Sequence, residues 1–465
     1  MRRASRIITA LLLLSASAAH ANGRFPNLET AHYQSGGDDL LIGGTFGLLY
    51  SKDGRTDFRW SCEAAIGYGG YFDPDLAESP AGVIFAGTFD GLARSEDGGC
   101  TWGFAGGDAR GFWIDGVVAH PTDANRVFLA TASGGKTNAI MGSTDAGKTF
   151  TVVPSTSSNV QFYKSLMMAP SDPMRLYATS YTVVPETTTL WKSTDGGQTF
   201  ATIDFPHKGG NTFQLLAIHP SNPDILFVKA DGPVPVGGGE PDVIVYRSTN
   251  GGVDFTEVYR SLELVGGLAL SADGQTVGLS TRPSGLKRSS NGGMSFTQVP
   301  GPPGDGGPRA AKQIRCLISH GGVLQGCGNN FSDGFAFGES PSFGATDGSW
   351  TKIMSFTDIK GPIVCPANAL ATWLPNPTST DPLDASRATR ELCEPLWPTT
   401  QVQLGIAGVD GGMIIPIDGS VTQPKDPGPC GCRTGSRGTL NPARAALALL
   451  ALLALIWRTR CKEPS

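Results

Sequence analysis

The chain has 465 residues, including 63 Gly and 33 Pro, with 17% charged residues and a formal net charge of −5. This charge balance excludes the basic footprint of a nucleic-acid-binding protein. Turn-forming residues are enriched but stay below the level typical of disordered chains. Length alone would suggest about three domains, but the internal repeats described below indicate a single one.

The first 21 residues have the pattern of a secretory signal. The sequence MRRASR is followed by the apolar stretch Ile7–Leu14 and by small residues that end at Ala21. A basic start, a short apolar core and a small-residue cleavage site are the three parts of a signal peptide. We therefore expect cleavage after Ala21 and export of the chain.

An eight-residue segment then recurs along the chain. Successive copies begin at residues 95, 143, 193, 248 and 289, and poorer copies occupy 51–58 (SKDGRTDF) and 345–350 (ATDGSW). A turn motif that returns every 40–55 residues is typical of a β-propeller with one blade per copy. The five good copies read SEDGGCTW (95–102), STDAGKTF (143–150), STDGGQTF (193–200), STNGGVDF (248–255) and SSNGGMSF (289–296).

The residue types in this segment are those of a turn. An Asp or Asn at the third position can accept backbone N–H groups, and Gly at the fifth allows a positive φ. A row of acids also suggests catalysis or Ca²⁺ binding, but two of the five good copies carry the neutral Asn. We therefore predict structural roles, with no cofactor and no metal, for Asp53, Asp97, Asp145, Asp195, Asn250, Asn291 and Asp347.

Short apolar runs bounded by turn residues surround each segment, as expected for antiparallel strands. They predict an all-β fold, a β-propeller of seven four-stranded blades in a single ring. Three predicted blades read 115–121, 126–133, 139–143 and 149–154; 165–170, 175–180, 189–193 and 199–205; and 214–220, 225–230, 243–248 and 254–259.

The repeated segment resembles the Asp-box (BNR) repeat, S/T-x-D-x-G-x-T-W/F, of sialidases, sortilin-type receptors and certain photosystem assembly factors. The resemblance covers most of residues 28–360. It implies that each segment joins the third and fourth strands of a blade, at the periphery and away from the central site.

The C-terminal region has a second recognisable pattern. A Pro-rich stretch leads to Cys430-Gly431-Cys432-Arg433, then to an apolar stretch over 445–457 and a basic tail. This order resembles the MYXO-CTERM sorting signal of myxobacteria. The resemblance implies processing by a sorting protease or anchoring at Cys430 or Cys432, while a plain C-terminal membrane anchor is the alternative. Both place the propeller outside the cytoplasm, at the cell surface or outer membrane or in the medium.

These patterns divide the chain into five parts. They are a signal peptide (1–21), a propeller (22–360), a disulfide-restrained segment with possible closing strands (361–420), a linker with the sorting motif (421–439) and a transmembrane helix with a basic tail (440–465). Strand character over 401–418 makes that stretch the candidate closing strand.

Six cysteines outside the C-terminal region fit an oxidising compartment: Cys62, Cys100, Cys316, Cys327, Cys365 and Cys393. Six thiols allow 15 pairings, among which the sequence does not choose. Cys316 and Cys327 lie on consecutive predicted strands and could face each other. A Cys365–Cys393 bridge would restrain an irregular segment, which would leave Cys62 for Cys100. A metal site is disfavoured because no C-x-x-C spacing occurs and the six His are scattered.

The sequence favours a binding or scaffold module for an unidentified extracellular glycan or protein over an enzyme. The alternative is an exo-acting, sialidase-like glycoside hydrolase, but Gly23-Arg24-Phe25-Pro26 matches the F/Y-R-I-P motif of sialidases poorly, and sialidases usually have six blades. Function in a propeller resides in its loops, here 231–241, 301–309 and 365–393. Candidate acids without a motif are Asp73, Asp75, Asp115 and Glu240, and His120 and His219 are predicted to end strands.

Overall fold

The computed structural model describes residues 24–406, except for residues 35, 70–71, 207–211, 234, 236–238, 302–311, 342, 344–347 and 375–380. The chain divides into two compact units, 1–414 and 415–465. The second unit, the predicted signal peptide, the Cys430–Cys432 motif and Asp347 all lie outside the described residues. Within the described part, no helix is long and apolar enough to span a bilayer.

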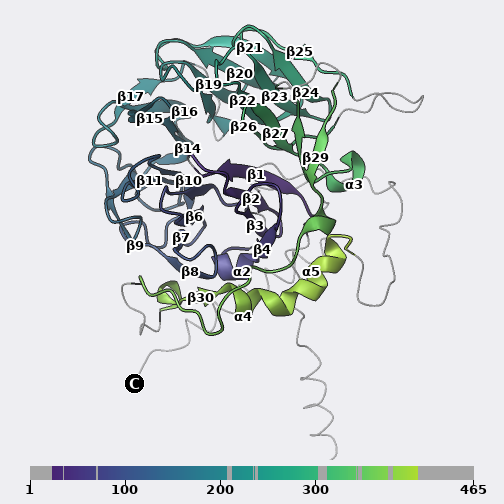
Figure 1. Ribbon diagram of the computed structural model, residues 1–465. Coiled ribbons are helices and arrows are strands. Elements are labelled where there is room, and N and C mark those ends of the chain that lie inside the picture. Colours follow the sequence, from purple (N-terminus) through teal and green to yellow (C-terminus); the bar gives the residue numbers. More distant parts are fainter. Residues whose placement is uncertain are drawn as a thin grey trace, which may run out of the picture. The chain divides into compact units, whose positions relative to one another are not determined.

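Seven antiparallel sheets form the fold, and each has four consecutive strands at its core (Figure 1). The all-β seven-bladed propeller predicted from the repeats is therefore confirmed. Blades 1 to 3 are β1 Leu28–Tyr33, β2 Leu40–Gly44, β3 Gly47–Ser51 and β4 Arg59–Ser61; β5 Leu76–Glu78, β6 Ile84–Gly87, β7 Leu92–Ser95 and β8 Thr101–Phe104; and β10 Ile114–Ala119, β11 Val127–Thr131, β12 Ile140–Ser143 and β13 Thr149–Val152, with β9 Gly106–Gly107 added parallel to β13.

The remaining four blades repeat the same order. They are β14 Gln161–Ala169, β15 Asp172–Thr182, β16 Thr187–Ser193 and β17 Ala201–Asp204; β18 Gln214–Ile218, β19 Leu226–Asp231, β20 Val243–Ser248 and β21 Thr256–Ser261; β22 Leu264–Leu270, β23 Val277–Arg282, β24 Gly285–Ser289 and β25 Thr297–Gln298; and β26 Leu317–His320, β27 Val323–Cys327, β28 Phe337–Ser340 and β29 Thr351–Met354.

The first strand of each blade is innermost, and these strands contact one another in the order β1, β5, β10, β14, β18, β22, β26 and back to β1. The repeated segments join the third and fourth strands, on the face we call the lower face. The opposite, upper face carries the connections between strands 2 and 3 and between successive blades. Candidate loop 231–241 connects β19 to β20 on the upper face where the structure describes it, and nearly all of candidate loop 301–309 falls outside the described residues.

Packing between blades explains the fifth-position glycine in three copies of the repeated segment. A β-carbon on Gly147 would lie 2.4 Å from the Phe85 ring of the preceding blade, and one on Gly197 would lie 2.4 Å from Phe128. Gly293 meets Phe227 at 2.5 Å in the same way. Real β-carbons do not approach so closely, so only glycine lets the loop close over the aromatic ring of the preceding blade. We call this contact the glycine–aromatic lock.

The C-terminal segment, which we call the strap (residues 355–406), covers the outer edge of blades 1 and 2. Pro362 forms a parallel bridge to Trp60 in β4, and β30 Arg387–Ala388 adds a fifth strand to β8. Short helices carry the strap past α2 Glu63–Ile66 (Figure 1). The helices are η2 Phe356–Asp358, η3 Pro382–Asp384, α4 Thr389–Cys393, η4 Glu394–Leu396 and α5 Trp397–Gln403, and α3 Asn330–Asp333 lies in blade 7.

Two disulfides fix the strap, at Cys62–Cys393 and Cys100–Cys365, and the third, Cys316–Cys327, lies within blade 7. The expected facing of Cys316 and Cys327 is confirmed. The expected Cys365–Cys393 and Cys62–Cys100 bridges are wrong, because the strap returns from blade 7 to the first two blades and brings distant cysteines together.

The closing strand predicted over 401–418 is also wrong where the structure describes it, since Gln401, Val402 and Gln403 end helix α5. Pro398 occupies the first turn of that helix, where its missing N–H costs nothing. The strap is held to the outer edges of blades 1 and 2 by its strand pairing and by two disulfides.

Candidate functional site

The carboxylates of the repeated segment accept hydrogen bonds from groups within their own turns. Asp145 accepts hydrogen bonds from the backbone of Lys148 and Thr149 at 3.1 and 3.0 Å and from the Thr149 hydroxyl at 2.6 Å. Burial alone would raise the pKa of Asp145, but the hydrogen bonds, chiefly those from Thr149, hold it below the usual value. Equivalent bonds to the third-position acid occur at Asp53, Asp97 and Asp195.

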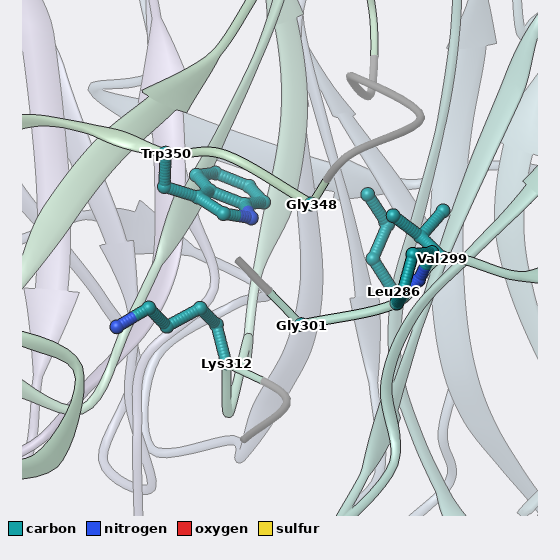
Figure 2. Close-up of a pocket in the computed structure, with 7 residues that line it drawn as sticks. Leu286, Val299, Gly301, Lys312, Gly348 and Trp350 are labelled. Atoms are coloured by element: carbon teal, nitrogen blue, oxygen red, sulfur yellow. The ribbon is translucent and has the colours of Figure 1, made fainter. Parts of the chain in front are cut away.

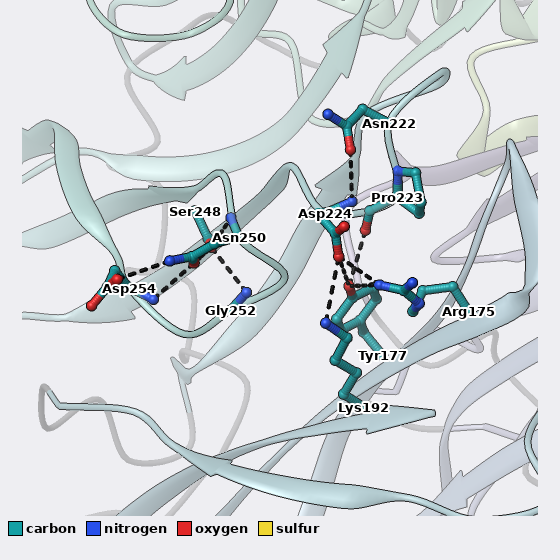
Figure 3. Close-up of polar contacts among 10 residues, drawn as sticks. All are labelled: Arg175, Tyr177, Lys192, Asn222, Pro223, Asp224, Ser248, Asn250, Gly252 and Asp254. Carbon is teal, nitrogen blue, oxygen red and sulfur yellow. Dashed lines mark hydrogen bonds and ion pairs between the residues drawn. The ribbon is translucent and has the colours of Figure 1, made fainter. Parts of the chain in front are cut away.

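The copies with Asn at the third position keep the same turn. In them the third residue donates a hydrogen bond to the seventh residue's side chain, whereas in the good Asp copies it accepts one. Asn250 accepts the backbone N–H of Asp254 at 2.9 Å, while its amide donates to the Asp254 carboxylate at 2.8 Å (Figure 3). Asn291 donates to the Ser295 hydroxyl at 2.9 Å. An acceptor-only carboxylate at the seventh position requires a donor at the third, and Asn supplies it.

The lower-face turns between the first and second strands of blades 3 and 5 also have structural roles. His120 Nδ1 accepts the backbone N–H of Asp123 at 3.0 Å, and His219 Nδ1 accepts that of Ser221 at 3.2 Å. Asp224, in the turn after His219, bonds Arg175 of the preceding blade at 2.5 Å (Figure 3). These groups therefore close turns and join blades.

Charged side chains gather on the inner strands instead. β-Bulges in β1, β10 and β14 leave Glu29, Asp115 and Lys164 outside the regular strand pairing. A bulge re-aims a side chain, and here the re-aimed groups reach the next blade. Lys164 bonds Asp115 at 2.9 Å between blades 4 and 3, and Arg315 bonds Glu29 at 2.8 Å between blades 7 and 1.

These residues belong to a set of seven that we call the inner charge ring. Its three acids come from blades 1 to 3 and its four bases come from blades 4 to 7, while Asp231 of blade 5 and Arg24 before blade 1 lie close enough to interact with Lys229 and Glu29. The members influence one another's pKa across blade boundaries. The ring consists of Glu29, Asp75, Asp115, Lys164, Lys229, Arg282 and Arg315.

Burial moves several of these groups toward neutrality. Desolvation raises the pKa of Asp75 to about 7, against a backbone hydrogen bond from Val117 and with the help of Asp115. Desolvation also raises the pKa of Asp115 to about 6, against the attraction of Lys164. The pKa of Lys229 falls to about 8 by desolvation. Adjacent blades therefore present two carboxyls that can hold or release a proton near neutral pH.

Aromatic side chains lie on the upper face beside the acidic half of the ring. Phe72, Phe89 and Trp113 form a cluster with centroid distances of 4.5, 5.0 and 5.9 Å. Phe89 is 46% exposed. The Trp113 indole N–H is buried with no hydrogen-bond acceptor among the described residues. Such rings provide an apolar platform with polar edges.

The sequence-predicted acids divide between these features. Asp75 and Asp115 belong to the inner charge ring, whereas Asp73 forms a bidentate ion pair with Arg24 at 2.8 and 2.6 Å. Glu240 lies in the exposed β19–β20 connection. The sequence analysis missed the basic half of the ring. One signal was available, because Asp115, Lys164 and Arg315 each stand at or just before the start of the apolar stretch of an innermost strand.

A small pocket between blades 6 and 7 offers no site of its own (Figure 2). Its volume is about 10 Å³, which is barely enough for one water molecule. Lys312 at its edge donates to the Asp333 carbonyl at 2.9 Å. The pocket is therefore too small to hold a ligand.

Comparison with known proteins agrees with the fold at a coarse level. Residues 138–273 match the Sortilin-Vps10 family, described as sortilin, neurotensin receptor 3. This match covers less than half of the chain. No curated protein matches the chain.

Solved propellers resemble the chain only distantly. An ancestral GH74 enzyme is 18% identical with a TM-score of 0.41, and the match covers 57% of this chain and 36% of that one. The Niastella koreensis GH74 enzyme is 17% identical with a TM-score of 0.39, covering 71% and 66%. YCF48 from Cyanidioschyzon merolae is 12% identical with a TM-score of 0.47, covering 66% and 94%. The chain thus spans about a third and about two thirds of the two GH74 enzymes.

Proposed function

We propose that this chain is an exported propeller that binds an extracellular glycan or protein at its upper face, above blades 1 to 3. The observation that carries the proposal is the coincidence of the acidic half of the inner charge ring with the cluster of Phe72, Phe89 and Trp113. Aromatic platforms beside polar, partly desolvated groups are the usual composition of a ligand site.

Several features support the remaining parts of this proposal. The hydrogen bonds of the repeated segment fit an Asp-box assignment, and three disulfides fit an oxidising compartment. Export through the N-terminal signal and anchoring or processing at Cys430 or Cys432 complete the proposal. The protein would then present the propeller at the cell surface.

The test is binding of the mature chain to a glycan array, with Phe89→Ala as the site variant. Met294→Ala is the matched control, since Met294 is an exposed apolar residue of a lower-face repeat. We expect binding that Phe89→Ala weakens at least tenfold and Met294→Ala leaves intact. Equal binding by all three chains would contradict an upper-face site.

Glycoside hydrolysis is the second candidate, and the pair Asp75 and Asp115 favours it. A carboxyl with a pKa of about 7 next to one with a pKa of about 6 suits an acid–base pair. Fluorogenic glycosides test it directly. Turnover that Asp75→Asn abolishes would establish the enzyme, whereas glycan binding without turnover would leave the binding module.

A further inference from the structure

The glycine–aromatic lock joins blades 2 to 3, 3 to 4 and 5 to 6, and neither of its partners is present where blade 7 meets blade 1. In blades 2, 3 and 5 the aromatic partners Phe85, Phe128 and Phe227 each follow the strand-2 residue that pairs with the repeat serine. The same position in blade 7 holds Gln325. Across the seam, the fifth residue of the repeated segment is Arg55 instead of glycine. Polar residues thus stand at both positions that the glycine and the aromatic ring occupy in the lock.

The seam opens into a cleft on the lower face. Its volume is about 430 Å³, within the range of small-molecule sites, roughly 300–1,000 Å³. Both blades contribute to its walls, and most of the side chains are polar. The cleft is lined by Tyr33, Asp38, Asp53, Arg55, His320, Gly321, Val323 and Glu339.

Strand register directs Gln325 toward this cleft. Gln325 pairs with Glu339 and stands two residues after Val323, so all three side chains project from the same face of blade 7. The residue is fully buried, and neither atom of its amide makes a well-formed hydrogen bond to any described residue. It lies close enough to the Tyr33 hydroxyl to affect its pKa. A buried amide requires partners, and among the described residues the Tyr33 hydroxyl is the one group that interacts with it.

The charges around the cleft are already matched in pairs. Asp38 contacts His320 at 2.9 Å and Glu339 contacts Arg55 at 2.8 Å. Asp53 accepts the Arg55 backbone N–H at 2.9 Å within its own turn. Three carboxylates face one guanidinium and one imidazole, which disfavours an anion. Because each carboxylate has a partner, a cation would have to displace one.

We propose that this seam cleft is a second binding site, for a neutral, hydroxyl-rich ligand of mono- to disaccharide size. Sugar hydroxyls both donate and accept, as the Gln325 amide and the Tyr33 hydroxyl require. The Tyr33 ring, stacked on His320 at 3.6 Å, forms an aromatic wall of the cleft. The site is separate from the upper face and does not depend on the function proposed there.

The test is saturation-transfer NMR of the mature chain with three neutral disaccharides: maltose, cellobiose and lactose. Inorganic phosphate and putrescine serve as the anionic and cationic probes. The second readout is the His320 ring signal, which reports occupancy of this cleft and no other. We expect at least one disaccharide to give transfer and to shift the His320 signal, while phosphate and putrescine do neither.

Gln325→Leu should weaken this binding at least tenfold and leave the melting temperature equal or higher, because a leucine is apolar like the residues at this position in blades 2, 3 and 5. Gln198→Leu, in the exposed repeat of blade 4, is the matched control and should bind normally. If Gln325→Leu does not fold, Tyr33→Phe removes only a hydroxyl and should also weaken binding. No disaccharide binding, binding unchanged by these variants, or a preference for phosphate or putrescine would each overturn the proposal.

Discussion

The two disulfides of the strap should stabilise the fold jointly, so the losses of unfolding free energy on removing them should not add. With Cys100–Cys365 intact, the Cys62–Cys393 bond closes a ring of only about 66 residues: the 38 from Cys62 to Cys100 and the 28 from Cys365 to Cys393. The chain-entropy relation gives such a ring about 4 kcal/mol of stabilisation. The same ring is opened by removing either bond, so each single removal should cost about 4 kcal/mol.

Removing both bonds also opens a loop of sequence separation 265, which the same relation values at about 6 kcal/mol. The double removal should therefore cost about 10 kcal/mol, roughly 2 kcal/mol more than the sum of the singles. The variants are Cys62→Ala with Cys393→Ala, Cys100→Ala with Cys365→Ala, and all four together.

The assay is guanidinium unfolding followed by tryptophan fluorescence, because Trp60 and Trp397 pack at 5.4 Å across the strap. Cys316→Ala with Cys327→Ala is the control, since that short loop lies within one blade and should add independently. Single losses below about 1 kcal/mol, or additive losses for the two strap bonds, would refute the idea that the strap latches the ring.

Three further outcomes follow from the structure. Gly197→Ala should cost about 2–4 kcal/mol in urea unfolding, through overlap with the preceding blade and strain at φ +82, whereas Gly134→Ala, with open space around it, should be neutral; equal effects would remove the lock. Asn250→Asp should lower stability by about 1 kcal/mol at pH 7, because the seventh position is also a carboxylate, and the loss should shrink in acid; a pH-independent loss would contradict this. Burial, aided by Asp39, raises the pKa of Glu78 to about 8 from 4.5, so stability should fall as pH rises from about 4.5 to 8, and Glu78→Gln should flatten that slope; an unchanged slope would refute the assignment.

The blade strands were predictable because their signals are local. Turn residues bound each apolar run, and the strand predicted at 243–248 coincides with β20. The repeated segments could be placed between strands three and four from their resemblance to a known repeat. The poor copy at 51–58 was also recognisable, because it keeps Ser51, Asp53 and the terminal aromatic residue although Arg55 stands where glycine is expected.

The candidate sites were harder to predict because they depend on contacts between distant parts of the chain. Arg55 pairs with Glu339 of blade 7 only because closure of the ring brings the first and last blades together. The charges of Asp115 and Lys164 become a pair only because bulges in neighbouring strands re-aim them. The disulfide pairing likewise depends on the path of the strap, which has little periodicity to reveal it.

The central claim is that the upper face binds a glycan or protein. Hydrogen exchange of the mature chain, with and without a glycan or protein found to bind it, tests this claim most directly. The account predicts slowed exchange in the upper-face connections at 72–75, 88–91 and 112–113, which carry Phe72, Phe89 and Trp113. The lower-face repeated segments at 143–150 and 193–200 should exchange at the same rate in both states. Protection confined to the lower-face repeats, with none at the upper face, would contradict an upper-face binding site.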